Sequence, residues 1–433
     1  MKQIIVSIIL IFGAICSNAQ NTDLYDQEIG SLINESKWFE VRDYHDKYKD
    51  SLSEFMRLFS SSLVNTYSNR PLDAIYNIQD LLQKYNERLG TQSFIFSILM
   101  ADNYAELQSY QYAHQVYTNL LNAKPYLDSV TLTRVVENEK LYRSLAQIPP
   151  MQIQPTQFSD TINTTFKNGG IFFTAQYNGK YKNTIFDTGA SGVAVDEKTA
   201  KEIGAKILKD SILVNASQYC KLGLIDSLKI GNILIVNVPC HILPNGFMSK
   251  DHDKIPKNKE IRFSAIIGCS VMKLISEIQI DLDKNRMVFN SKETKEGNFN
   301  NLLLHHGVCI VSMRINGFPA MMYWDTGQQR VPVFTENFYR EHLNDLPKLS
   351  KLKNGILGGL EGICNFSYYE LKNLIFQIPD KKILFPNVQV IDSVQASEFA
   401  FSNIFPCDGR FGQLPSHVKM ITINFKQMSV CFD

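Results

Sequence analysis

The sequence has almost no net charge and no strongly basic segment. Its 44 lysines and arginines oppose 43 aspartates and glutamates, which leaves a formal charge of +1. No run of Lys and Arg is interleaved with aromatic side chains, so we expect no nucleic-acid partner. With 433 residues, 44% of them hydrophobic and 20% charged, the chain is expected to form about two or three globular domains.

The sequence also lacks the common metal-binding motifs. It contains neither a CxxC pair nor an HExxH motif, so we expect no zinc site, and no cofactor is indicated. Of its 8 cysteines, Cys16 would be lost with a signal peptide, and the odd number that remains argues against a disulfide framework. We expect mostly buried thiols, while isolated bridges in an oxidising compartment remain open.

Long apolar runs are absent after the N-terminus. The single such run, from Ile4 to Ile15, precedes small and polar residues. This pattern is typical of a secretory signal peptide over residues 1–20, with Ser17 and Ala19 suited to the cleavage site. We therefore expect an exported protein, periplasmic or extracellular, with no membrane span. A retained anchor and a lipid-modified Cys16 are less favoured, because the run is short for a bilayer and an isoleucine precedes the cysteine.

Glycine and proline are scarce between residues 21 and 147, where the sequence has helical periodicity. The stretch FSILMADNYAELQSYQYAHQVYTNLL resembles a tetratricopeptide (TPR) unit, which is a helix, a tight turn and a second helix. A similar stretch lies 39 residues away, with Ala74 aligned with Ala113, whereas that family repeats at about 34. An irregular antiparallel bundle is the open alternative. In either case we expect a docking module for a protein partner, followed by a linker over 148–157.

The remaining sequence has β-strand periodicity, and one stretch of it occurs in two similar copies. YNGKYKNTIFDTGASGVAV begins at Tyr177 and INGFPAMMYWDTGQQRVPV at Ile315, and the two align without a gap at an offset of 138 residues. In each, an Asn-Gly hairpin signal precedes Asp-Thr-Gly by nine residues. A given tripeptide occurs by chance about 0.1 times in a chain of this length, so two copies in register indicate a duplication.

Further matching patterns follow both copies. A short helix pattern, DEKTAKEIG or FTENFYREHL, comes first, and a strand hairpin, SEIQIDLDKNRMVF or KMITINFKQMSVCF, ends each copy. We therefore predict two homologous lobes over 158–290 and 300–433, joined by a linker over 291–299. The expected fold class is α+β multidomain, with an all-α N-terminal region over 21–147 followed by a bilobal all-β region.

A strand that runs into Asp-Thr-Gly once per lobe resembles the aspartic proteases of the pepsin and retropepsin clan. With a signal peptide and helices in front, the chain is similar to exported bacterial retropepsin-like proteins. The resemblance covers the two lobes and implies an acid-protease-like fold with Asp187 and Asp325 as the catalytic pair. Two carboxylates that share a proton can activate water for peptide hydrolysis. Because one chain carries both halves, we expect a monomer that acts on a peptide or protein substrate.

The residues that follow each aspartate have expected supporting roles. Gly189 and Gly327 have no Cβ atom and would let the two turns approach back to back. The hydroxyls of Thr188 and Thr326 would donate hydrogen bonds to the backbone of the opposite lobe. Together these four residues are expected to hold the two turns as one rigid unit.

The second lobe departs from the first in two places. The resemblance implies a hydrogen bond from Ser191 to Asp187, but Gln329 stands at the corresponding position of the second lobe. Ile266-Ile267-Gly268 looks like the hydrophobic-hydrophobic-glycine turn of such lobes, and its nearest match is Arg410-Phe411-Gly412. An arginine at a buried turn needs a partner. These changes leave both aspartates in place but affect how they are tuned.

Each lobe offers a candidate flap, a hairpin that would close over a bound peptide. In the first lobe the tip falls at 215–217, with Tyr219 available to reach the substrate. In the second, Gly358 and Gly359 suit a mobile loop. Ordinary strand packing for Tyr219 and a plain surface turn for the glycines are the alternatives.

Two other functions compete with a protease. A serine hydrolase is disfavoured because Ser191 does not lie in a nucleophile-elbow sequence. A protease fold kept as a peptide-binding or scaffold protein, with weak or no catalysis, is the serious alternative, because a fold does not guarantee chemistry. Retention of both aspartates favours an enzyme, since a pure binder has no need of two facing carboxylates.

Overall fold

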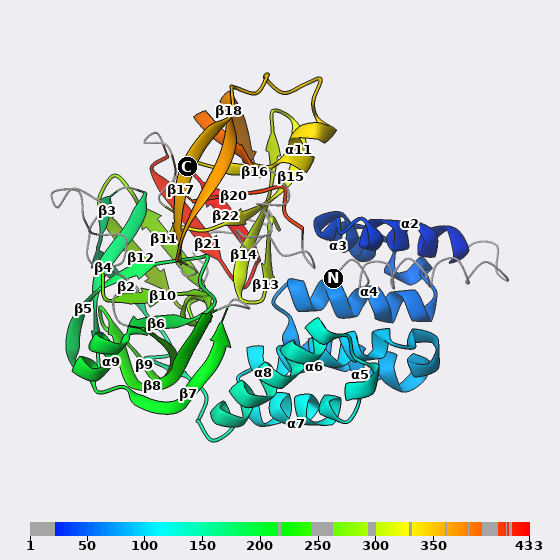
Figure 1. The fold of residues 1–433 in the computed structure, drawn as a ribbon, viewed down its shortest axis with the longest axis horizontal. Helices are drawn as coiled ribbons and strands as arrows, with labels where there is room; N and C mark the ends of the chain where they lie inside the picture. Colours follow the sequence, from blue (N-terminus) through cyan, green and yellow to red (C-terminus); the bar gives the residue numbers. More distant parts are fainter. Residues whose placement is uncertain are drawn as a thin grey trace. The chain divides into compact units, whose positions relative to one another are not determined.

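The structure, a computed structural model, describes residues 22–167, 169–214, 218–244, 263–292, 300–328, 331–359, 362–379, 381–391, 406–412, 414 and 418–433 (Figure 1). It contains two compact units, a helical one that ends at Pro150 and a β-rich one that begins at Met151. The expected fold class, helices followed by a bilobal β region, is confirmed. No helix within the described ranges is long and apolar enough to span a bilayer.

In the helical unit each α-helix packs on the next one along the chain. The last two pairs share an apolar cluster in which Ala101 packs with Tyr117, Leu120 and Val135. The predicted helix–turn–helix is present as α6 and α7, while its assignment as a TPR unit stays a prediction. The helices are α2 (Thr22–Asn34), α3 (Trp38–Tyr48), α4 (Glu54–Tyr67), α5 (Pro71–Leu89), α6 (Gln92–Glu106), α7 (Tyr110–Leu121) and α8 (Ser129–Leu145), with short 3-10 turns at Lys49–Ser51 and Lys124–Tyr126.

The first lobe is a nine-stranded sheet in the order β1-β9-β6-β10-β5-β4-β8-β7, with β3 beside β4 (Figure 1, green). The predicted Asn178-Gly179 turn joins β4 and β5, and both residues have positive φ. The elements are β1 (Gln152–Gln154), β3 (Thr165–Lys167), β4 (Gly170–Tyr177), β5 (Lys180–Phe186), β6 (Val193–Asp196), α9 (Glu197–Ile203), β7 (Lys206–Val214), β8 (Gln218–Ile230), β9 (Ile233–Leu243), β10 (Ala265–Ile267) and α10 (Cys269–Met272).

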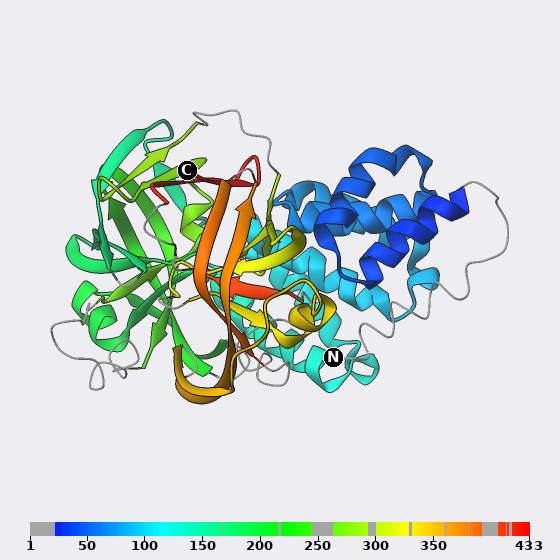
Figure 2. The same cartoon turned by 90° about the horizontal axis from the view of Figure 1, so that it is seen from above.

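The second lobe repeats this plan in an eight-stranded sheet, β13-β14-β15-β20-β16-β19-β18-β17. Its strands β14 and β15 start and end 138 residues after β4 and β5, so the offset found in the sequence is also the structural one. Figure 2 shows the long β17–β18 hairpin in gold to orange. The elements are β13 (Leu302–His305), β14 (Val308–Ile315), β15 (Phe318–Trp324), β16 (Val333–Thr335), α11 (Glu336–Glu341), β17 (Lys353–Gly359), β18 (Gly362–Ile378), β19 (Lys381–Ile391) and β20 (Gly409–Phe411).

A third sheet joins the lobes. The two predicted terminal hairpins are present, and they pair edge to edge through β11 and β21, with Ile278 opposite Ile423. Buried apolar residues of both lobes form one continuous core around this junction. The sheet has the order β2-β12-β11-β21-β22, with β2 (Ser159–Asn163), β11 (Glu277–Asp281), β12 (Arg286–Asn290), β21 (Met420–Asn424) and β22 (Ser429–Phe432).

The sequence predicted a linker over 148–157, but part of this segment is a β-strand. Residues 152–154 form β1, which pairs antiparallel with β9 and places Ile153 against the core. The prolines on both sides of this short alternating stretch concealed the strand signal. For the second predicted linker, 291–299, all but the first two residues lie outside the described ranges.

Candidate functional site

The two Asp-Thr-Gly turns lie at the ends of equivalent strands, Asp187 after β5 and Asp325 after β15. Each strand runs parallel to a short strand behind it, β10 in the first lobe and β20 in the second. The backbone N–H of Asp187 donates to the carbonyl of Ile267 at 3.0 Å, and that of Asp325 donates to Phe411 at 2.8 Å. The apolar residues that precede each aspartate are buried, and they anchor the turn in the core.

Four hydrogen bonds tie the turns to one another. The Thr188 hydroxyl donates to the carbonyl of Trp324 at 2.8 Å and accepts from the Thr326 N–H at 3.1 Å. Reciprocally, the Thr326 hydroxyl donates to the carbonyl of Phe186 at 2.8 Å and accepts from the Thr188 N–H at 3.0 Å. Both threonines are buried. The predicted contact of each hydroxyl with the opposite lobe is present, and each hydroxyl also satisfies an N–H.

Replacing Thr188 by Val should destabilise the β-rich unit by about 2–6 kcal/mol. Valine has the shape of threonine but no hydroxyl, so a buried carbonyl and a buried N–H would each lose a partner, at about 1–3 kcal/mol apiece. The measurement is chemical denaturation followed by near-ultraviolet circular dichroism. The matched control is Thr174→Val on the exposed side of β4, which should change stability by less than about 0.5 kcal/mol. Equal effects of the two substitutions would contradict this role for Thr188.

The glycines of the two turns bring each carboxyl against the opposite turn. A Cβ atom at Gly189 would lie 2.5 Å from Cγ of Asp325, and one at Gly327 would lie 2.6 Å from Oδ2 of Asp187. Real Cβ atoms do not approach other atoms so closely, so any larger residue would displace the carboxyl it faces. The close approach that the sequence predicted is therefore present, and each carboxyl lies against the turn that carries the other aspartate.

Each carboxyl is held by its own turn. Oδ1 of Asp187 accepts the Gly189 N–H at 2.9 Å, and Oδ1 of Asp325 accepts the Gly327 N–H at 2.9 Å. Burial raises the pKa of Asp187, while the Gly189 N–H and the positive charge of Arg410 oppose that rise. Asp187 is half-buried, and Asp325 is 3% exposed. A carboxyl with a raised pKa is able to carry a proton at mildly acidic pH.

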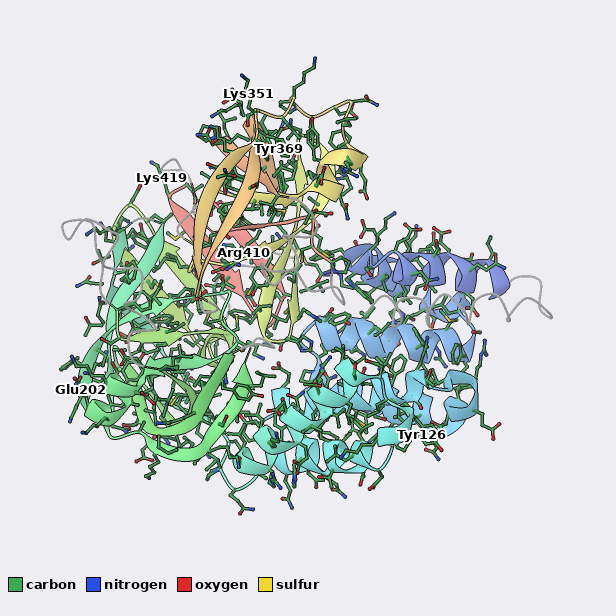
Figure 3. All side chains as sticks on the ribbon, viewed as in Figure 1. Tyr126, Glu202, Lys351, Tyr369, Arg410 and Lys419 are labelled. Carbon is green, nitrogen blue, oxygen red and sulfur yellow. The ribbon has the colours of Figure 1, made fainter. Side chains whose placement is uncertain are left out.

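Arg410 contacts the second aspartate. Its Nη2 donates to Oδ2 of Asp325 in a close ion pair, and its guanidinium lies 5.4 Å from the ring centroid of Tyr323. Figure 3 labels Arg410 where the green elements of the first lobe meet the yellow to red elements of the second. The sequence showed that an arginine replaces Ile266 of the first lobe and needs a partner, but it did not identify Asp325 as that partner.

Two further contacts between the lobes were not predicted from the sequence. The Tyr323 hydroxyl donates to the carbonyl of Gly189 at 3.0 Å. Cys269 and Cys309 come from different lobes, and their Sγ atoms lie 3.6 Å apart beneath the carbonyl of Thr188. The aligned copies contained a signal for the first contact, because Tyr323 stands where the first lobe has an isoleucine. The predicted burial of cysteines is confirmed for Cys220, Cys240, Cys269, Cys309 and Cys407.

The predicted hydrogen bond from Ser191 to Asp187 is not present. The Ser191 side chain is exposed, and its carbonyl accepts the N–H of Ser270 at 2.9 Å. In the second lobe the Gln328 amide donates to the carbonyl of Val331 at 3.1 Å, and Gln329 lies outside the described residues. A serine two positions after Gly189 can turn outward, since nothing in the motif fixes its χ1 angle.

The flap candidates lie on paired strands. In the first lobe β7 and β8 are antiparallel, and Tyr219 lies on β8 with 57% of its surface exposed. The predicted tip, 215–217, is outside the described residues. In the second lobe Gly358 and Gly359 end β17 and pair with the start of β18. Both candidates are thus hairpins, and their closure over a substrate stays a prediction.

The described ranges contain no group of three His, Cys, Asp or Glu side chains that would hold a metal ion. The site therefore consists, in those ranges, of two carboxyls, an arginine, a tyrosine and the backbone groups that fix them.

Part of the first lobe is similar in sequence to a known protein family. Residues 173–270 match the family model described as "Aspartyl protease", and this range includes Asp187 and the whole Asp-Thr-Gly turn. No curated protein matches the chain. One matching solved structure is the crystal structure of a retropepsin-like aspartic protease from Rickettsia conorii. Its sequence is 17% identical to this one, the match covers 33% of this chain and 93% of that chain, and the TM-score is 0.22. In residues 173–270 the chain is thus similar to the aspartyl protease family.

Proposed function

We propose that the protein is a single-chain aspartic endopeptidase that hydrolyses peptide bonds through Asp187 and Asp325. The observation that carries this proposal is the reciprocal locking of two duplicated Asp-Thr-Gly turns by Thr188 and Thr326. A fixed, matched pair of turns presents two carboxyls to each other. Facing carboxyls cost stability, and acid–base chemistry gives them a use.

The proposed reaction needs one proton on the pair. The ionised carboxyl takes a proton from a water molecule, whose oxygen attacks the peptide carbonyl carbon. The protonated carboxyl donates its proton to the carbonyl oxygen. When the tetrahedral intermediate collapses, the C–N bond breaks and the amine nitrogen takes up the proton that the pair received from water. One hydroxyl of the intermediate returns its proton to the pair as the carbonyl re-forms, so a free acid and a free amine leave and the pair again carries one proton. The raised pKa of Asp187 suits it to be the proton donor.

A second function is a peptide-binding or scaffold protein with weak or no catalysis. The ion pair between Arg410 and Asp325 favours it, because a cation on a carboxylate oxygen makes that oxygen a weaker base. The two functions make opposite predictions for turnover. They agree on a peptide or protein ligand at the lobe boundary.

Export, the monomeric state and the helical unit complete the proposal. Residues 1–20 have the pattern of a signal peptide, which supports a periplasmic or extracellular location. One chain supplies both turns, so activity requires no second copy. The stacked helices present the kind of surface that repeat proteins use to bind protein partners. A protein partner or substrate is accordingly assigned to that unit.

The deciding experiment is cleavage of a diverse peptide library between about pH 3 and 7, analysed by mass spectrometry. The mature protein and its Asp187→Asn variant are compared at equal concentration. We expect cleavage products from the first and none from the second. Identical product sets, or intact peptides that merely bind to both proteins, would overturn the endopeptidase and support the binding protein.

A further inference from the structure

The two halves of the site differ in charge although they match in backbone. Strand β10 pairs with β5 so that Ile266 lies opposite Ile185, and β20 pairs with β15 so that Arg410 lies opposite Tyr323. Since Ile185 and Tyr323 are 138 residues apart, Ile266 and Arg410 occupy the same place in the two lobes. Ile266 is buried and has no charge. The second lobe therefore has a cation where the first has an apolar side chain.

This cation contacts one carboxyl directly. Oδ1 of Asp325 is taken by the Gly327 N–H, and Oδ2 is taken by Arg410. The Asp325 side chain is 4% exposed and that of Arg410 is 29% exposed, so solvent screens the pair only in part. Asp187 has the matching backbone hydrogen bond on its Oδ1 from Gly189. Arg410 reaches Asp187 through its charge, without a hydrogen bond.

Two other titratable groups beside the pair, Tyr323 and Cys309, are held in their neutral forms. Tyr323 of β15 faces Asp187 and Arg410, and burial raises its pKa. Cys309 of β14 lies behind Asp187, and the hydrogen bond with Cys269 together with burial raises its pKa. Arg410 is the cation that contacts Asp325 and acts on Asp187 through its charge. An opposite charge in contact with a carboxyl favours the ionised form.

We propose that Arg410 is a positioning residue that keeps the Asp325 carboxyl ionised and leaves the proton of the pair on Asp187. This assignment rests on the endopeptidase proposed above and gives its two aspartates fixed roles. Asp325 is the base that accepts the proton of water, and Asp187 is the acid that protonates the carbonyl oxygen. The stacking of Arg410 on Tyr323, whose hydroxyl is bound to the first lobe, holds the guanidinium in place.

The test is the pH profile of kcat/KM for a reporter peptide, measured for the mature protein and for Arg410→Leu. Loss of the cation disfavours ionisation of both carboxyls, so both limbs of the profile should move to higher pH, the acid limb by about one to three pH units. Arg410→Lys retains the charge and should keep the original profile. Arg286→Leu, which removes an arginine from a different buried aspartate, Asp281, should also leave the profile unchanged.

A measurement that needs no turnover keeps the proposal separate from the proposed function. The carboxyl carbons of 13C-labelled aspartate are titrated by NMR, and Asp187→Asn and Asp325→Asn assign the two signals. In the unsubstituted protein we expect the Asp325 signal to stay in its ionised position throughout the range in which Asp187 titrates. Titration of both signals together, or an unchanged profile in Arg410→Leu, would overturn the role of Arg410. Cleavage by Asp187→Asn at the full rate would instead overturn the endopeptidase.

Discussion

Replacing Asp325 by Asn should lower kcat/KM for peptide cleavage by about a thousandfold or more. Asparagine keeps the shape and the Gly327 N–H contact but carries no negative charge, so it cannot accept a proton from water. The measurement is the initial rate on a reporter peptide taken from the library, with thermal unfolding monitored in parallel. A folded Asp325→Asn protein that retains more than about a tenth of the rate would contradict the proposed role.

Two further variants make this result specific. Asp281→Asn neutralises another buried aspartate paired with an arginine, Arg286, in the sheet that joins the lobes. It should leave the rate within about twofold, because it does not touch the Asp-Thr-Gly turns. The double variant Asp187→Asn/Asp325→Asn should be no slower than either single variant, since residues that act as one unit lose their function together. Additive losses would show that the two aspartates act independently.

Replacing Gly412 by Ala should abolish cleavage and destabilise the second lobe by about 3 kcal/mol or more. A Cβ atom there would lie 1.8 Å from the backbone oxygen of Asp325, and backbone cannot move aside as a flexible side chain can. Asp325 would have to shift, and its contact with the first lobe depends on its position. The measurements are denaturant unfolding and the rate of peptide cleavage.

The control is Gly192→Ala, in the loop that follows the first turn. A Cβ atom at Gly192 would meet one atom, Oγ of Ser270, at 3.7 Å, which is an ordinary contact. The free energy of unfolding should therefore change by less than about 1 kcal/mol. It should increase slightly if the alanine restricts the conformations of the unfolded chain. If Gly412→Ala lowered stability and cleavage as little as Gly192→Ala, this result would contradict the close approach of β20 to the second turn.

Much of the site could be predicted because the sequence contains it twice. The Asn-Gly hairpins, the two strands that end in Asp-Thr-Gly and the terminal hairpins all follow from local patterns that recur at one offset. A duplication turns weak local signals into a joint one. The roles of Thr188 and Thr326 follow as well, because short buried hydroxyls at a lobe boundary need backbone partners.

Contacts between distant segments could not be predicted in the same way. Strands β11 and β21 each belong to a hairpin with a neighbouring strand. Neither sequence indicates that the two hairpins pair with each other. The ion pair of Arg410 with Asp325 depends on where β20 lies behind β15, so the sequence showed an unpaired cation and not its partner. Ser191 was assigned by analogy, and its outward position depends on a side-chain rotamer that the motif does not determine.

The most direct test of a site built by one chain is a mixing experiment. Equal amounts of Asp187→Asn and Asp325→Asn are combined over a wide range of protein concentration, and peptide cleavage is measured. Because each chain supplies both turns to its own site, the mixture should be as inactive as either variant alone. Recovery of activity that grows with concentration would mean that intact pairs form between chains, and it would contradict a single-chain active site.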